Sequence, residues 1–224
     1  MTSRWVLAGT LSAAAVGYQK LLRPWQERWG ARDDEVRAAL VGDELVAEPA
    51  SQSTRAITIE APPERVWPWV VQLGADRAGF YSYDWLEDLF GLGIHSADRV
   101  VPDWQHRSVG ELVAANASGS GGWYVAKMVP GQVLVLQLAD VAHGRPARRD
   151  GRTRWEFVWI FALQDQGDGR TRLLVRERVG FGSTAVRLLM GPVGMVSFVM
   201  TQKMLRGIKA RAERPTEDPH AAQD

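Results

Sequence analysis

The sequence contains no cysteine. This absence excludes disulfide bonds, thiolate zinc sites and a cysteine nucleophile. The chain also lacks an excess of charge of either sign, because 27 lysines and arginines balance 26 aspartates and glutamates to a net charge of +1. A nucleic-acid surface needs a clustered excess of basic side chains. We therefore expect no nucleic-acid partner.

Familiar catalytic motifs are missing as well. The chain has no glycine-rich phosphate loop ahead of a Lys-Ser/Thr pair, no HExxH and no nucleophile elbow. The glycine-rich stretch 119–122 leads into a predicted strand rather than a helix, so it is no nucleotide fingerprint. A metal cluster could be drawn from His95 and Asp98 with Asp84 or Glu87, but this spacing is not diagnostic. We predict neither a metal nor a cofactor.

No apolar run is long enough to span a bilayer, which takes roughly 18 to 20 residues. The longest candidate, at residues 5–18 (WVLAGTLSAAAVGY), is shorter than that. Three interpretations stay open: a membrane anchor or short span at residues 5–22, a cleaved signal peptide, and a helix that docks on the domain. Positive charge follows the run at Lys20, Arg23, Arg28 and Arg32. By the positive-inside rule it keeps the domain cytoplasmic, attached under the first interpretation to the inner face of the cell membrane.

Apolar material is plentiful elsewhere, with 46% hydrophobic residues and ten tryptophans. A chain of this length can bury a sizeable core without a staple. The pattern predicts an apolar N-terminal helix at 1–22, a polar connector at 23–54, one folded domain at 55–213 and a disordered tail at 214–224.

Alternation and turn residues predict the elements of that domain. A first strand at 55–60 leads into a helix that starts at Pro62-Pro63 and ends at Gly74. Further strands are predicted at 109–114, 122–128, 133–138, 154–163 and 171–179. A long C-terminal helix at 183–213 follows, with an interruption near Gly191, Pro192 and Gly194. This order predicts an α+β fold in which a curved antiparallel sheet wraps around the last helix and leaves a cavity between them.

Several segments resemble the START-like, SRPBCC superfamily of polyketide cyclase/dehydrase type. Residues 57–67 (ITIEAPPERVW) resemble its opening, in which a strand ending in I-x-A-P-x-x-V-W feeds the first helix. Residues 79–87 and 94–99 resemble an uncharacterised bacterial subgroup, and residues 171–178 resemble the penultimate strand. The resemblance covers about residues 55–213. It implies a helix-grip cavity that holds lipids, sterols or polyketides, and some members are aromatases or cyclases.

Aromatic residues are the first candidates for the cavity wall. Trp155, Phe157, Trp159 and Phe161 alternate along one predicted strand, so they project from one face of the sheet. Core packing is the simpler interpretation for the two phenylalanines. The two tryptophans, with Trp123 on a neighbouring strand, could equally line a cavity. The segment with Tyr83, Trp85 and His95 is a candidate lid, or an aromatic loop that only pins itself to the domain.

One charged residue is assigned to the site. Arg176 and Glu177 are consecutive in a strand, so only one of them can face the cavity, and a buried charge must be paired. We assign Arg176, although pairing with Arg154 or Glu156 is the more common explanation. The full set of predicted ligand-binding residues is Tyr83, Trp85, His95, Trp123, Trp155, Trp159, Arg176, Met200 and Met204.

The sequence thus predicts a protein that binds or carries a hydrophobic small molecule rather than an enzyme. The alternative is a polyketide cyclase/aromatase- or hydratase-like enzyme, with Tyr83, Asp84 or His95 moving protons in the same cavity.

Overall fold

The computed structural model describes residues 17–82, 96–148, 155–181 and 191–215. Within these ranges the sheet has seven strands in the order β1-β7-β6-β4-β3-β2, with β5 paired to β4, and every pairing is antiparallel. The strands are β1 (Ser51–Ile59), β2 (Leu112–Ala114), β3 (Gly122–Val129), β4 (Val133–Asp140), β5 (Arg145–Pro146), β6 (Trp155–Asp165) and β7 (Thr171–Phe181). The helices are η1 (Tyr18–Leu22), α2 (Arg23–Glu27), α3 (Asp33–Arg37), η2 (Asp43–Val46), α4 (Pro63–Val71), η3 (Pro102–Trp104), η4 (Val141–His143) and α7 (Gly191–Ala212).

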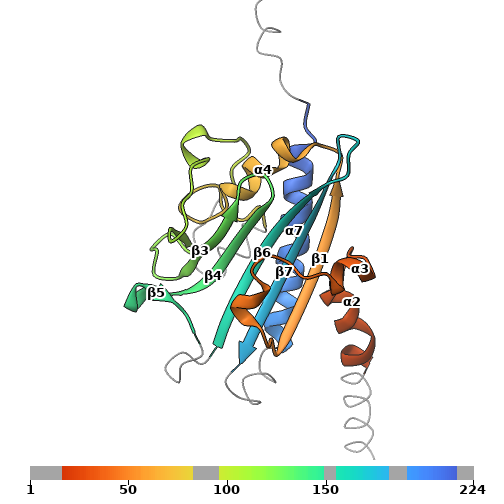
Figure 1. Ribbon diagram of the computed structural model, residues 1–224, viewed down its shortest axis with the longest axis vertical. Helices are drawn as coiled ribbons and strands as arrows, with labels where there is room; N and C mark the ends of the chain where they lie inside the picture. The colour runs from red at the N-terminus through yellow and green to blue at the C-terminus, as the bar shows by residue number, and fades with distance from the viewer. Residues whose placement is uncertain (1–16, 83–95, 149–154, 182–190, 216–224) are drawn as a thin grey trace, which may run out of the picture.

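The long helix α7 lies across one face of the sheet, behind β6, β7 and β1 in Figure 1. Its buried residues Met204, Leu205 and Ile208 join the main core with the inward side chains of β6 and β7, such as Phe161 and Val175. This arrangement confirms the predicted fold class, a curved antiparallel sheet wrapped around a C-terminal helix. The helix α7 runs without a break from Gly191 to Ala212, and residues 183–190 of the predicted helix lie outside the described residues.

The N-terminal segment, residues 17–50, runs from the β1 edge onto the opposite face of the sheet, where its later part forms a second layer. In Figure 1, η2 crosses in front of β6 and β7, while α2 and α3 lie along the β1 edge. Val46 of η2 is buried against Val135, Val158 and Ile160, whose side chains point away from α7. The region predicted as a polar connector therefore covers the outer face of the sheet. Its last residues belong to β1, which begins at Ser51 rather than at residue 55.

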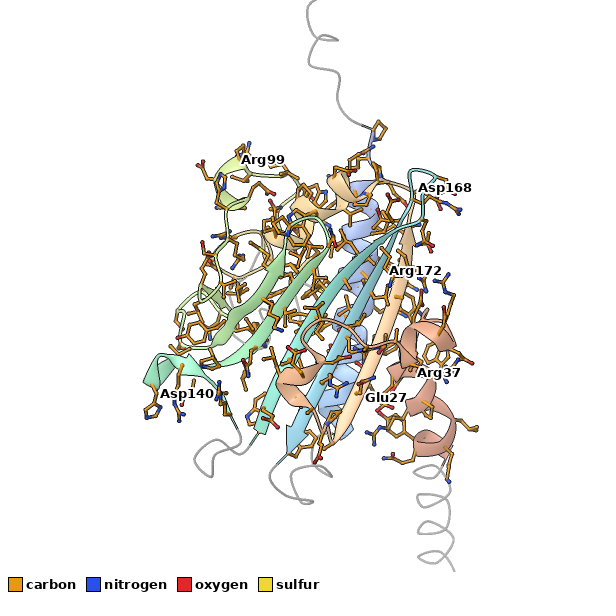
Figure 2. All side chains as sticks on the ribbon, viewed as in Figure 1. Glu27, Arg37, Arg99, Asp140, Asp168 and Arg172 are labelled. Atoms are coloured by element: carbon orange, nitrogen blue, oxygen red, sulfur yellow. The ribbon has the colours of Figure 1, made fainter. Side chains whose placement is uncertain are left out.

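Three arginines of β7 hold this segment in place. Arg172 donates to both carboxylate oxygens of Glu35 in α3, each at 2.8 Å, and Figure 2 shows it on the side of the sheet where α3 lies. Arg176 donates to Asp43 Oδ2 at 2.6 Å. Arg178 donates to the carbonyl of Val46 at 3.0 Å. Since these residues alternate along the strand, they form one ladder on the face away from α7.

Two ends of elements differ from the prediction. The helix α4 stops at Val71, three residues before Gly74. Gly74 has φ of +134° and exchanges two backbone hydrogen bonds with Gly79, at 3.0 and 2.8 Å, so it closes a short loop instead of capping the helix. The strand predicted at 109–114 is confined to Leu112–Ala114. In the described ranges, no helix combines the length and the apolar character needed to cross a membrane.

Candidate functional site

A cavity of about 390 Å³ lies between the inner face of the sheet and α7. Its volume falls in the range of roughly 300 to 1,000 Å³ that is usual for small-molecule sites. The described lining residues come from the sheet, from α7 and from the N-terminal segment: Tyr18, Arg23, Gln26, Glu27, Ser51, Ser53, Arg55, Phe80, Ser82, Ala115, Trp123, Leu138, Trp155, Phe157, Trp159, Glu177, Val179, Phe181, Val193, Gly194, Ser197, Met200, Thr201 and Met204.

Aromatic rings make up one wall of the cavity. Trp123 on β3 and Trp159 on β6 have ring centroids 5.3 Å apart, and Phe80 stacks on Trp159 at 6.1 Å. Phe157 continues the row with its centroid 6.4 Å from that of Trp159. The strand alternation that places these rings on one face also points them toward α7. The indole nitrogens of Trp123 and Trp159 are buried and find no acceptor among the described residues, so the surface that these rings present to the cavity consists of carbon atoms.

The structure brings five of the predicted site residues together. Trp123, Trp155, Trp159, Met200 and Met204 all line the cavity. Met204 is buried and packs in the main core, and it also forms part of the cavity wall. Trp155 lies at the end of its strand and remains 38% exposed. The predicted lid residues Tyr83, Trp85 and His95 lie outside the described residues.

Arg176 does not line the cavity, which corrects its assignment to the site. Its side chain is on the outer face, where it bonds Thr54, Asp43 and backbone carbonyls of the N-terminal segment. The neighbouring residue, Glu177, takes the inward position. Alternation predicted that the two residues face opposite ways. The direction of each side chain is set by tertiary contacts. Arg176 faces outward to partners more than 100 residues away in the sequence, and Glu177 faces inward to hydroxyl groups of α7.

Glu177 is the centre of a buried polar cluster in the cavity wall. Its carboxylate accepts hydrogen bonds from Ser197 at 2.9 and 2.8 Å, from Thr201 at 3.0 Å and from Ser53 at 3.2 Å. Arg55 on β1 lies 3.2 Å away through Nη1. Burial alone would raise the pKa of Glu177, but the charge of Arg55 and the hydrogen bonds from Ser197, Thr201 and Arg55 outweigh it. The pKa of Glu177 therefore lies below its usual value and the group is ionised at neutral pH.

The N-terminal segment completes the cavity on the β1 side. Tyr18 donates to Gln26 Oε1 at 3.3 Å, and Arg23 pairs with Glu27 at 2.7 Å. Trp25 holds α2 against α7 through an edge contact with Phe198, with centroids 5.3 Å apart. Sequence reasoning missed these lining residues because five-residue helices carry little periodicity. The polar composition of the segment suggested a linker.

In the described part of the chain, no group of three or more His, Asp or Glu side chains is placed to hold a metal ion.

Comparisons with known proteins identify similar backbones only. No family model matches the chain, and no curated protein matches it. Protein CV1439 from Chromobacterium violaceum is 16% identical with a TM-score of 0.44, and the match covers 73% of this chain and 98% of that one. Protein jhp0584 from Helicobacter pylori is 12% identical with a TM-score of 0.48, over 79% and 96% of the two chains. DynU16, from the dynemicin biosynthetic locus, is 14% identical with a TM-score of 0.42, over 70% and 47%.

Proposed function

We propose that this chain is a helix-grip protein of the START-like, SRPBCC type that binds or carries a hydrophobic small molecule. The observation that carries the proposal is the cavity of about 390 Å³ whose wall is built from stacked and tilted aromatic rings. Apolar walls with a few placed polar groups are typical of ligand sites. The methionines Met200 and Met204 add flexible surface that adapts to varied ligand shapes.

Binding is favoured over catalysis by the state of the buried carboxylate. A general acid or base works best with a pKa near the working pH. The pKa of Glu177 is lowered instead, and its oxygens accept from three hydroxyls and one arginine. Such a group is a poor proton acceptor. The cyclase-like alternative rests on Tyr83, Asp84 and His95, which lie outside the described residues.

A cavity-filling variant tests the binding proposal. Val179 lines the cavity from β7, so Val179→Phe places a ring in the space that a ligand would occupy. Val129→Phe is the matched control, because Val129 is 38% exposed at the end of β3 and does not line the cavity. The readout is the fluorescence of N-phenyl-1-naphthylamine, a neutral dye that brightens in apolar sites.

The wild type and Val129→Phe should bind the dye with similar affinity. Val179→Phe should bind it at least about tenfold more weakly, which corresponds to a loss of about 1.4 kcal/mol in binding free energy. Far-UV circular dichroism checks that all three proteins are folded. Identical dye titrations for the two phenylalanine variants would contradict the proposal.

We also propose that ligand is exchanged at an anionic lipid bilayer. Exposed apolar side chains lie on three elements that border the cavity, with Leu21 on η1 at 76% exposure, Trp25 on α2 at 52%, and Val193 and Met195 on α7 at 50% and 42%. Residues 191–202 contain no charged side chain, whereas residues 17–32 carry four basic residues and one acidic residue. An apolar surface beside basic residues suits the interface of an anionic membrane.

Flotation with vesicles tests this surface. The full chain should float with phosphatidylglycerol vesicles and less with neutral phosphatidylcholine vesicles, and Val193→Ser/Met195→Ser should reduce the bound fraction. Val100→Ser/Val109→Ser is the control, since both valines are exposed but lie away from the cavity. Equal flotation of the two double variants would contradict membrane exchange through this surface.

A further inference from the structure

In the buried ion pair between Arg55 and Glu177, one donor nitrogen of the arginine has no acceptor among the described residues. Glu177 is saturated: Ser53, Ser197, Thr201 and Arg55 supply five contacts, against about four lone-pair sites on a carboxylate. A further donor brought by a ligand would find no free acceptor here.

Arg55 is different, because a guanidinium has five N–H donors. Its Nε donates to the carbonyl of Gln26 at 3.0 Å, and its Nη1 serves Thr201 at 3.4 Å and Glu177 at 3.2 Å. None of the described residues accepts a hydrogen bond from Nη2. Arg55 is nevertheless 98% buried, with a relative exposure of 2%, and it lines the cavity.

Nη2 is the nitrogen of Arg55 that is left to face the cavity, because Arg55 lines the cavity and its Nε and Nη1 already have partners. A buried donor that stays unsatisfied costs roughly 1 to 3 kcal/mol, and more when it is charged. An oxygen placed in the cavity beside Nη2 would recover that cost.

We infer that Arg55 Nη2 donates a hydrogen bond to a neutral oxygen of the ligand, a carbonyl or hydroxyl on an otherwise apolar molecule. This inference rests on the proposed function and narrows its ligand class. The charge of Arg55 is already balanced by Glu177, so an anionic ligand would leave a net buried negative charge. A cationic ligand would find the carboxylate oxygens occupied. The apolar remainder of the ligand lies against the aromatic wall that contains Trp123 and Trp159.

A series of nine-carbon ligands separates these cases. Nonane, 2-nonanone, nonanoate and nonylamine are titrated against the full chain loaded with N-phenyl-1-naphthylamine, and dye displacement is measured. The ketone should displace the dye at concentrations at least about tenfold below those needed for nonanoate or nonylamine, as expected for one hydrogen bond to a charged donor without a charge to bury. This comparison needs only the wild-type protein.

Two matched variants then assign the effect to Arg55. Arg55→Lys keeps the positive charge beside Glu177 but removes Nη2. Arg170→Lys makes the same exchange at an arginine that is exposed, pairs with Asp168 and does not line the cavity. Affinity for 2-nonanone, relative to nonane, should fall about tenfold in Arg55→Lys and stay unchanged in Arg170→Lys.

The outcomes distinguish this inference from the proposed function. If the wild type takes up the dye but has the same ratio of 2-nonanone affinity to nonane affinity as Arg55→Lys, the role of Arg55 is overturned and the binding proposal stands. Tighter binding of nonanoate or nonylamine than of the ketone would overturn the ligand class. No uptake of dye by the wild type would overturn the proposed function, and the inference with it.

Discussion

Replacing Arg176 by methionine tests whether the N-terminal segment is an integral layer of the fold. The side chain is 1% exposed. It donates to Asp43 at 2.6 Å, to Thr54 at 2.9 Å, and to the carbonyls of Glu35, Val36 and Ala38 at 2.9, 3.2 and 2.8 Å. Methionine fills similar space but satisfies none of these acceptors.

The expected loss follows from what is left unpaired. Removing one partner of a buried ion pair costs about 3 to 5 kcal/mol. Asp43 keeps 18% of its side-chain exposure and is partly hydrated after the change, so we expect the lower end, about 3 kcal/mol. That is a large share of the roughly 5 to 15 kcal/mol that stabilises an ordinary domain.

Urea denaturation measures the loss, and hydrogen exchange locates it. Arg176→Met should lower the free energy of unfolding and speed amide exchange in residues 33–47. Arg170→Met is the control, because Arg170 is exposed in the turn before the same strand and pairs with Asp168, so no measurable change is expected. A loss below about 1 kcal/mol, within the range of an exposed ion pair, would refute the reasoning, as would unchanged exchange at residues 33–47.

Two further predictions concern pH and packing. The pKa values of Glu35 and Glu177 are lowered in the folded state, since arginine contacts and hydrogen bonds outweigh the burial that would raise them. The stability they contribute is therefore complete above their unfolded pKa of about 4.3 and declines as pH falls through the lower folded values. Urea titrations from pH 7 to 3 should show this decline, and Glu177→Gln should make it shallower. Gly207→Ala places a Cβ 2.7 Å from the carbonyl oxygen of Tyr81 and 2.9 Å from its Cβ. We expect a loss of about 1 to 3 kcal/mol in unfolding free energy, and an unchanged melting temperature would show that this contact yields freely.

The sheet and its aromatic wall were predictable because their pattern is local. Alternation along residues 155–161 identifies the strand and the shared face of Trp155 and Trp159 without any knowledge of tertiary partners. The turn residues around each strand place the remaining elements in the same way. The rings that this face presents to α7 then become the cavity wall.

The N-terminal layer was not predictable because its stabilising contacts are long-range. Glu35 bonds Arg172 across 137 positions of sequence, and Asp43 bonds Arg176 across 133. Each of these acidic residues sits in a helix of four or five residues, too short for a periodic signal. The same contacts decide that Arg176 faces outward, and local sequence cannot supply that choice.

Native mass spectrometry with organic extraction, on the full chain purified from its own host, tests the central claim most directly. The account predicts a stoichiometric, apolar co-purifying molecule with a carbonyl or hydroxyl oxygen, lost in Val179→Phe and retained in Val129→Phe. A mass equal to that of the polypeptide alone, unchanged after incubation with 2-nonanone and with the apolar dye, would contradict the claim that this cavity binds a hydrophobic ligand.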